Sequence, residues 1–351
     1  MKKIYLWIAG LALVVFAFQI FSILNSAGAF KTIVPHGDKN GVLIPLPVAG
    51  PEDLELERDS MILFISSDDR RDLNSNSGAI LAVNLKKPGT EVNIVSPQLN
   101  DFHPHGFSLY KDGQGRVFLL VISHKKNPAS SVVERFEWIN GALIHLETIT
   151  DPNIMTSPND IVAVGERSFY FTNDHYYTQP GLGKTFEEYL QRPISYIGFF
   201  NGEKFSIAAE GLSYANGINR SPGGDTVYAT STTGRKLHVY SRLADGGLKL
   251  EVEVPLETGA DNIDVDTNGN LLIGCHPQLL KFVKHAEDPS THSPSQVLRV
   301  FPSNGFKVEE IFLNDGGQYS GSSVAVQAFD KLYIGAVFES SLLVVTMASP
   351  Q

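Results

Sequence analysis

The amino-acid sequence predicts an all-β fold, a six-bladed β-propeller preceded by an N-terminal hydrophobic helix. The first observation is a motif that repeats six times: polar residues, then an aliphatic or aromatic residue, a turn and an apolar strand. The motifs lead with Glu52, His105, Asn159, Asn216, Asp261 and Ser322, spaced by 53, 54, 57, 45 and 61 residues. A period of this size with several strands per repeat is typical of a propeller. The second observation is that helical periodicity is scarce.

Each motif leads into a run with the composition of a β-strand. The runs are 61–66, 117–122, 168–171, 226–230, 270–275 and 331–337. Turn sequences such as Lys111-Asp112-Gly113 and Asn268-Gly269 accompany them. A short surface helix is expected from Thr185 to Gln191. The expected organisation is an N-terminal segment over 1–29, a connector and closing strand over 30–47, and the propeller over 48–351.

The first thirty residues differ from the rest of the chain. Lys2 and Lys3 precede a largely apolar run of 21 residues from Ile4 to Leu24, long enough to span a bilayer with the N-terminus in the cytoplasm. Ala27-Gly28-Ala29 fits a signal-peptidase site, although the run is longer than a usual signal sequence. The sequence therefore predicts export, as a membrane-anchored protein facing away from the cytoplasm or, if the segment is cleaved, as a secreted one.

Composition excludes several classes of function. The 351 residues include 38 acidic and 28 basic side chains, a net charge of -10, which argues against nucleic acid as a partner. The single cysteine, Cys275, excludes an intramolecular disulfide and a Cys-based zinc site. Cys275 lies in an apolar run and is expected to be a buried small residue. Ser322-Ser323 lacks the Gly-x-Ser-x-Gly pattern of a serine hydrolase.

The leading residues of the repeats should converge, because equivalent positions of the innermost strands face the same end of a propeller channel. Turn formation or capping explains any single Asn or Asp, but it does not explain a ring of them. Carboxylate and amide oxygens without sulfur favour a hard cation, and calcium fits best. Asp53 and Asp160, each one residue further on, are expected to form a second, deeper calcium site with a carbonyl near Phe107.

Motifs along most of the chain match those of a known family. They include Pro51-Glu52-Asp53-Leu54, Pro104-His105-Gly106, Asn159-Asp160-Ile161-Val162-Ala163-Val164-Gly165, Phe171-Thr172-Asn173-Asp174-His175-Tyr176, Ala215-Asn216-Gly217-Ile218-Asn219, Asp261-Asn262-Ile263 and Gly274-Cys275-His276-Pro277. From about Val48 to Val344 the chain resembles the serum paraoxonase/arylesterase family of calcium-dependent lactonases. The resemblance implies a six-bladed propeller with a central calcium tunnel that holds two ions.

The resemblance also implies roles for individual residues. The residues matching the catalytic calcium ligands are Glu52, Asn159, Asn216, Asp261 and Asn262. Those matching the structural calcium site are Asp53, Asp160 and the main chain near Phe107. His105 matches the family histidine near the catalytic ion, and His124 matches its dyad partner. His276 matches a position that borders the active site, and Tyr214, next to Asn216, is expected to line the substrate pocket.

The expected chemistry is hydrolysis of lactones and of aryl or other carboxylic esters. Calcium would polarise the carbonyl, and His105, supported by His124, would activate water. A carboxylate ligand, Glu52 or Asp261, is the alternative base. The alternative functions are a gluconolactonase-like or strictosidine synthase-like propeller with different chemistry, or a non-catalytic binding propeller held at the membrane. The complete ligand set together with both histidines favours the hydrolase.

One departure from the family pattern concerns closure of the ring. The animal enzymes close their propeller with a disulfide, whereas this chain has Val344 at the matching C-terminal position and no cysteine near the start of the propeller. We therefore expect the segment around Val42 to Leu46 to close the ring by pairing with the last blade.

Overall fold

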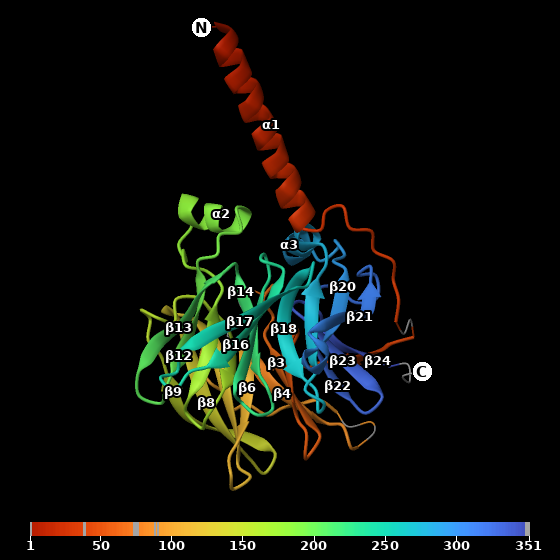
Figure 1. The fold of residues 1–351 in the computed structure, drawn as a ribbon. Coiled ribbons are helices and arrows are strands. Elements are labelled where there is room, and N and C mark those ends of the chain that lie inside the picture. The colour runs from red at the N-terminus through yellow and green to blue at the C-terminus, as the bar shows by residue number, and fades with distance from the viewer. Residues whose placement is uncertain (1, 38–39, 73–76, 88, 90, 348–351) are drawn as a thin grey trace.

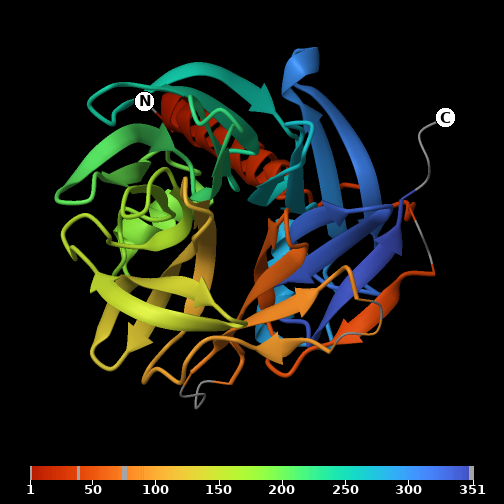
Figure 2. The same cartoon turned by 90° about the horizontal axis from the view of Figure 1, so that it is seen from below.

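A computed structural model describes residues 2–37, 40–72, 77–87, 89 and 91–347. Six antiparallel sheets of four strands each surround a central axis, so the predicted fold class is confirmed (Figures 1 and 2). Figure 2 looks along this axis and shows the sheets as blades around a common centre. Five blades are continuous in sequence, and the sixth contains both the first and the last strand.

The strands of each blade are numbered along the chain. Blade 1 contains β2 (Pro51–Glu57), β3 (Ile62–Ser67), β4 (Ala79–Asn84) and β5 (Asn93–Ile94). Blade 2 contains β6 (Pro104–Lys111), β7 (Val117–Lys126), β8 (Ala129–Ile139) and β9 (Ala142–Ile149). Blade 3 contains β10 (Pro158–Ala163), β11 (Phe169–Asn173), β12 (Ser195–Phe200) and β13 (Phe205–Leu212).

Blade 4 contains β14 (Ala215–Arg220), β15 (Thr226–Ser231), β16 (Lys236–Arg242) and β17 (Leu248–Pro255). Blade 5 contains β18 (Gly259–Val265), β19 (Leu271–His276), β20 (Ser295–Phe301) and β21 (Lys307–Asn314). Blade 6 contains β22 (Ser322–Ala328), β23 (Lys331–Ala336), β24 (Ser341–Thr346) and β1 (Val42–Pro45). Each leading residue of the repeat therefore lies on the innermost strand of its blade.

Strand pairing and apolar packing close the ring between the first and last blades. β1 pairs antiparallel with β24, and Val42 lies opposite Val344. Beneath this pairing, Leu54 of β2 and Leu342 of β24 belong to one buried hydrophobic cluster. Similar clusters fill the other spaces between neighbouring blades. Because this apolar surface is removed from water only when all blades are in place, it stabilises the closed ring.

Three α-helices lie at one end of the propeller (Figure 1). They are α1 (Lys2–Ser26), α2 (Leu182–Tyr189) and α3 (Leu279–Glu287), and a short 3₁₀ helix, η1 (Pro302–Asn304), lies elsewhere. α2 is the helix expected over Thr185 to Gln191, with bounds a few residues earlier. The sequence does not predict α3. The repeat pattern places strands on both sides of it, and its nine residues are too few to show a clear helical periodicity.

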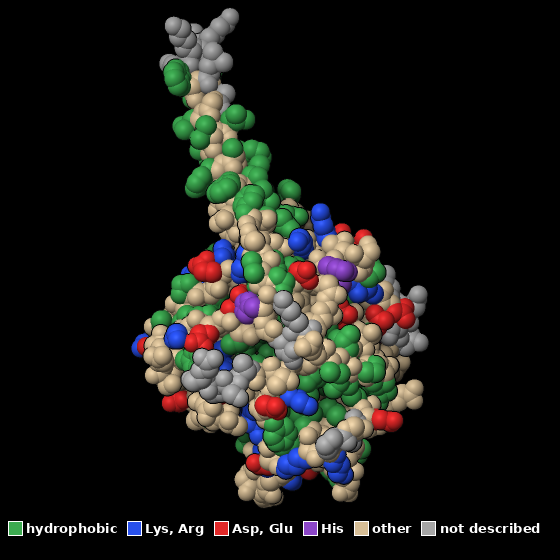
Figure 3. Space-filling view, turned by 90° about the vertical axis from the view of Figure 1, so that its right-hand side faces the viewer, with side chains coloured by type: hydrophobic (Ala, Val, Ile, Leu, Met, Phe, Trp, Pro, Cys, Tyr) green, Lys and Arg blue, Asp and Glu red, His purple; other side chains and the backbone are tan. Residues whose placement is uncertain are grey.

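α1 projects away from the propeller and carries exposed hydrophobic side chains (Figures 1 and 3). Its C-terminal end is fixed to the propeller, since the carbonyl oxygen of Ala27 accepts a 2.9 Å hydrogen bond from the Leu279 amide. Among the described residues, none of the helices combines the length and the apolarity needed to cross a membrane. The membrane anchor remains a prediction from the sequence.

All six innermost strands depart from regular pairing at the same point. The shift in register lies between Pro51 and Asp53 in β2, and the others lie at 104–107, 158–161, 215–218, 260–263 and 322–324. These positions are the heads of the six repeats. A β-bulge re-aims the side chains next to it, so the bulges determine how the polar residues meet.

Candidate active site in the central tunnel

The bulged segments of neighbouring blades touch closely enough to require glycine. A Cβ atom on Gly106 in blade 2 would lie 2.4 Å from Asp160 Oδ1 in blade 3. A Cβ atom on Gly217 in blade 4 would lie 2.5 Å from the carbonyl oxygen of Asp261 in blade 5. Real Cβ atoms do not approach other atoms this closely, so larger residues would push the blades apart. The glycines next to His105 and Asn216 therefore allow the ring to close around the tunnel.

Four buried oxygens of the predicted calcium ligands have no hydrogen-bond partner among the described residues. They are Glu52 Oε2, Asn159 Oδ1, Asn216 Oδ1 and Asn262 Oδ1. Buried polar atoms are normally paired, and an unpaired one costs free energy. Hydrogen bonds hold some of these side chains: Asn262 Nδ2 donates to Glu52 Oε1 at 2.9 Å, and Asn216 Nδ2 donates to Thr232 Oγ1 at 3.0 Å. With the amide nitrogens occupied, the free oxygens fit a hard cation.

The other predicted ligand, Asp261, is bound to a histidine. His276 Nε2 lies 2.8 Å from Asp261 Oδ2, and the His276 ring stacks on Phe282 at 3.8 Å between centroids. No cluster of three or more His, Cys, Asp or Glu side chains suited to a metal occurs in the part of the chain that the structure describes. This agrees with the composition of the predicted set, in which amides outnumber carboxylates.

Electrostatics distinguish the two carboxylates of this ring. Burial alone would raise the pKa of Glu52, but the neighbouring His105 and Arg70 outweigh burial and lower it to about 2. Burial raises the pKa of Asp261, and its contact with His276 only partly opposes that effect. The protein alone therefore keeps Glu52 ionised, whereas ionisation of Asp261 would benefit from a cation.

The deeper pair, Asp53 and Asp160, is held by main-chain amides. Asp53 Oδ2 accepts a 2.9 Å hydrogen bond from the Phe107 amide, and Asp160 Oδ2 accepts a 2.7 Å hydrogen bond from the Ile218 amide. Burial, together with the charge of Asp160 nearby, raises the pKa of Asp53 well above its usual value. Burial likewise raises the pKa of Asp160. Two fixed, buried carboxylates whose charges repel each other require either protons or a cation.

The two predicted catalytic histidines form a hydrogen-bonded chain that ends at Ser131. His105 Nδ1 lies 2.9 Å from His124 Nε2, and His124 Nδ1 lies 3.0 Å from Ser131 Oγ. Burial lowers the pKa of His124 to about 3, so this ring is neutral at ordinary pH. The other nitrogen of His105, Nε2, lies 3.5 Å from Glu52 Oε1. The pair therefore directs one free imidazole nitrogen at the ring of oxygens.

Two groups beside this site were not predicted from the sequence. His175 bonds Asp174 at 2.8 Å and Glu188 at 3.1 Å, and its ring meets the predicted pocket residue Tyr214 edge to face at 4.8 Å. Arg70 Nη2 lies 3.9 Å from Glu52 Oε2. The sequence pattern could not indicate either group, because both lie in loops outside the repeated motif.

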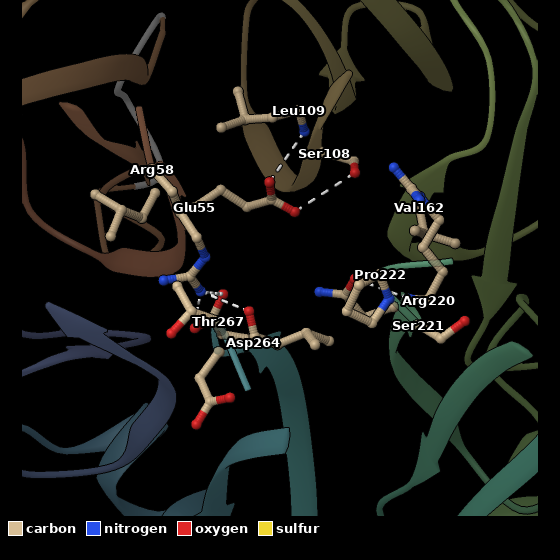
Figure 4. A pocket seen from close by; sticks show the side chains of 14 residues that line it. Glu55, Arg58, Ser108, Leu109, Val162, Arg220, Ser221, Pro222, Asp264 and Thr267 are labelled. Atoms are coloured by element: carbon tan, nitrogen blue, oxygen red, sulfur yellow. Dashed lines mark hydrogen bonds and ion pairs between the residues drawn. The ribbon is translucent and has the colours of Figure 1, made fainter. Parts of the chain in front are cut away.

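The opposite end of the tunnel contains a separate polar cavity of about 280 Å³ (Figure 4). It is lined by residues three or more positions after the repeat heads on the inner strands and by the turns that follow these strands. Glu55 accepts a 3.1 Å hydrogen bond from the Leu109 amide, and burial raises its pKa to about 8. Arg58 pairs with Asp264 at 3.1 Å (Figure 4). These groups bond each other, unlike the unpartnered oxygens at the first end.

The fold and site together define a class: six-bladed propellers whose inner strands gather carboxylates, amides and histidines at one end of a central tunnel. The chain belongs to the arylesterase family, since the family model described as Arylesterase matches residues 70–345. It is 34% identical to serum paraoxonase/arylesterase 1 of Rattus norvegicus over 97% of this chain and 98% of the relative. It is 30% identical to serum paraoxonase/arylesterase 2 of Homo sapiens over 95% and 96%.

Solved structures support the fold at much lower identity. A gluconolactonase from Xanthomonas campestris superposes with a TM-score of 0.55 at 15% identity, covering 90% of this chain and 94% of the other. A putative gluconolactonase superposes with a TM-score of 0.54 at 14% identity, covering 90% and 95%. At this identity the likeness concerns the propeller alone.

Proposed function

We propose that this protein is a calcium-dependent hydrolase of lactones and aryl esters. The observation that carries the proposal is the His105–His124 pair, which ends at a ring of buried oxygens without hydrogen-bond partners. Family membership adds support, because the relatives are named as arylesterases. A non-catalytic binding propeller would have no use for a histidine pair with this arrangement.

Two groups of residues would hold calcium. The set for the catalytic ion is Glu52, Asn159, Asn216, Asp261 and Asn262, and the set for the structural ion is Asp53, Asp160 and the main chain near Phe107. Calcium bound by the first set would act as a Lewis acid on the carbonyl of the ester. The buried free oxygens of the first set and the raised pKa values of the second pair support this assignment.

His105 acts as the general base in this proposal. In the tautomer proposed here, His124 Nδ1–H donates a hydrogen bond to Ser131 Oγ, which leaves His124 Nε2 as an acceptor for the Nδ1–H of His105. Glu52 Oε1 lies 3.5 Å from His105 Nε2, and once calcium held Glu52 this nitrogen would be free to carry a lone pair and take a proton from the attacking water. The low pKa of His124 keeps that ring from competing for the proton. Asp261, bound to His276, is the alternative base.

Tyr214 and His276 are proposed to line the substrate pocket. Tyr214 has a left-handed backbone conformation, with φ of 58°, and it packs against His175. A side chain held in this way gives the pocket a fixed apolar wall. His276 is proposed to border the pocket through its contact with Asp261, and the stacked Phe282 ring holds it in this position.

The propeller is also proposed to be exported, with the N-terminal segment at the membrane or removed. The apolar run of α1 and its exposed side chains support this. N-terminal sequencing of the purified protein and alkaline extraction of membranes separate an anchored protein from a cleaved, secreted one.

The decisive experiment measures hydrolysis of a lactone panel and of phenyl acetate, with calcium and after its removal. His105→Gln should lower kcat by about a hundredfold or more while calcium still stabilises the protein. Asp261→Ala should abolish turnover and remove the stabilisation that comes from the catalytic ion, and His292→Gln, at an exposed position, should behave as the wild type. Full activity of His105→Gln would reject its role as base, and no turnover of any substrate would reject the enzyme.

A further inference from the structure

Two consecutive arginines beside the oxygen ring have different surroundings. Arg71 is fixed to the propeller: its Nη2 donates to the carbonyl oxygen of His285 at 2.5 Å, and its guanidinium lies 4.5 Å from the centre of the Phe338 ring. Arg70 has only one hydrogen bond among the described residues, a long one of 3.4 Å from Nη1 to the carbonyl oxygen of Asp68. Arg71 therefore holds the loop in place, whereas most donors of Arg70 remain available.

Arg70 lies at the reacting end of the candidate site. Its Nη2 is 3.9 Å from Glu52 Oε2, which is too long for a hydrogen bond. Its charge contributes to the low pKa of Glu52 and of His124, so it acts on both the oxygen ring and the histidine pair. Only 20% of the side chain is exposed to solvent. Water therefore satisfies few of the five N–H donors of this guanidinium.

The acidic neighbours of Arg70 in its own loop are already engaged. Asp68 bonds His103 Nδ1 at 3.0 Å. Asp69 Oδ1 accepts the amide hydrogens of Arg71 at 3.1 Å and Asp72 at 3.2 Å. Glu52 remains as a distant ion-pair partner, and it also belongs to the proposed calcium ligands. A largely buried cation with free donors in a reaction site fits a carboxylate, which guanidinium binds in a two-pronged geometry.

We propose that Arg70 binds a carboxylate group of the substrate, so that the preferred substrates are lactones or esters that carry a negative charge close to the reacting carbonyl. This rests on the proposed function, because it assigns the substrate class of that same site. The carboxylate group takes no part in bond making: the guanidinium orients the substrate and distinguishes charged from neutral molecules.

The test compares a γ-lactone carrying a carboxylate with its neutral analogue, 5-oxotetrahydrofuran-2-carboxylate with the corresponding carboxamide. The calcium-loaded wild type should have the higher kcat/KM for the carboxylate. Arg70→Gln should lower that value by about tenfold to a hundredfold more than it lowers the value for the carboxamide, because its effect on Glu52 and His124 applies to both substrates. Arg70→Lys should recover part of the loss. Arg116→Gln, at an exposed position, is the control for loss of charge alone.

Equal losses on both substrates would overturn the proposal and make Arg70 a counter-ion of Glu52 only. A wild-type preference for the carboxamide would also overturn it. Calorimetric titration with the product, 2-hydroxyglutarate, gives a readout that needs no turnover: Arg70→Gln should weaken its binding by about tenfold or more. If neither lactone is hydrolysed but the product binds through Arg70, the hydrolase function fails and the anion site stands.

Discussion

Removal of calcium should make the stability of this protein fall as the pH rises. The reason lies in the buried pair Asp53 and Asp160, whose pKa values are raised in the folded protein by burial and, for Asp53, by its neighbour. Without a cation, the folded state keeps protons that the unfolded chain releases above about pH 4. The free energy of unfolding therefore decreases with pH from that value up to the folded pKa values.

The slope can be worked out from the number of protons. Each proton held only by the folded state contributes about 1.4 kcal/mol per pH unit, so the pair contributes up to about 2.7 kcal/mol per pH unit. Bound calcium would keep both carboxylates ionised in the folded protein, and this contribution would vanish. Glu55 acts in the same direction, and His124 and His238, whose pKa values fall to about 3 and about 4, act in the opposite one. These backgrounds cancel when slopes with and without calcium are compared.

Urea unfolding followed by tryptophan fluorescence measures the effect. Trp138 packs edge to face on Phe64 at 5.0 Å, so its emission should report loss of the contact between blades 1 and 2. Protein stripped of calcium on a chelating resin is compared with calcium-loaded protein from pH 5 to pH 8. Asp53→Asn should halve the contribution of this pair to the calcium-dependent slope and raise the stability of the metal-free protein, because it removes one of the two buried carboxyl groups. Asp330→Asn, at an exposed position, is the control.

Two outcomes would refute this reasoning. The first is a slope that is the same with and without calcium, which would mean that the pair is not a cation site. The second is an unchanged slope in Asp53→Asn, which would place the linked protons on other groups. Asp261 also has a raised pKa. If the difference between the slopes with and without calcium persists in Asp53→Asn but disappears in Asp261→Asn, the effect belongs to the ring of oxygens that contains Asp261.

Two further predictions concern the histidine chain and the contact between blades. Ser131→Ala should lower kcat for phenyl acetate by about tenfold without changing stabilisation by calcium, because His124 loses the partner that fixes its tautomer; an unchanged kcat would show that the hydroxyl has no such role. Gly106→Ala should destabilise the protein by about 1–3 kcal/mol in urea unfolding, because its Cβ would meet Asp160. Gly113→Ala, with open space around its Cβ, should leave stability close to that of the wild type, and an equal loss in both variants would contradict the steric argument.

The sequence predicts the number of blades and their innermost strands, because the polar heads recur at intervals of 45 to 61 residues. It does not predict the bulges at these heads. A bulge depends on hydrogen bonds to the neighbouring strand. The sequence of one strand alone does not determine the register in which it pairs. Strict alternation would place Asp261 and Asn262 on opposite faces. In the structure, Asn262 bonds Glu52 and Asp261 bonds His276 within the same buried ring.

The parts of the candidate site that lie outside the repeat are those that residue patterns miss. His124 lies on the second strand of blade 2, so only the family resemblance indicated its role, and its partner Ser131 lies on the third strand. Arg70 follows the end of β3, in a loop whose charged residues are typical of a solvent-exposed turn. The sequence does not distinguish Arg70 from Arg71. Only the folded structure shows that Arg71 contacts His285 and Phe338, whereas Arg70 lies beside Glu52.

The bulges also explain why this tunnel can support two separate functions. In blades 1 and 3 the bulge places consecutive polar residues in neighbouring clusters, so Glu52 joins the ring of oxygens while Asp53 joins the deeper pair. Nearby basic groups keep Glu52 ionised, with a pKa of about 2, whereas Asp53 lies among other carboxylates and has a raised pKa. The proposed catalytic cluster therefore contains a carboxylate that stays ionised without a metal, whereas the deeper pair is stable in the folded protein only when a cation or protons neutralise it. It follows that a change at Asp53 should act first on stability and a change at His105 first on turnover, although the two residues lie in the same tunnel.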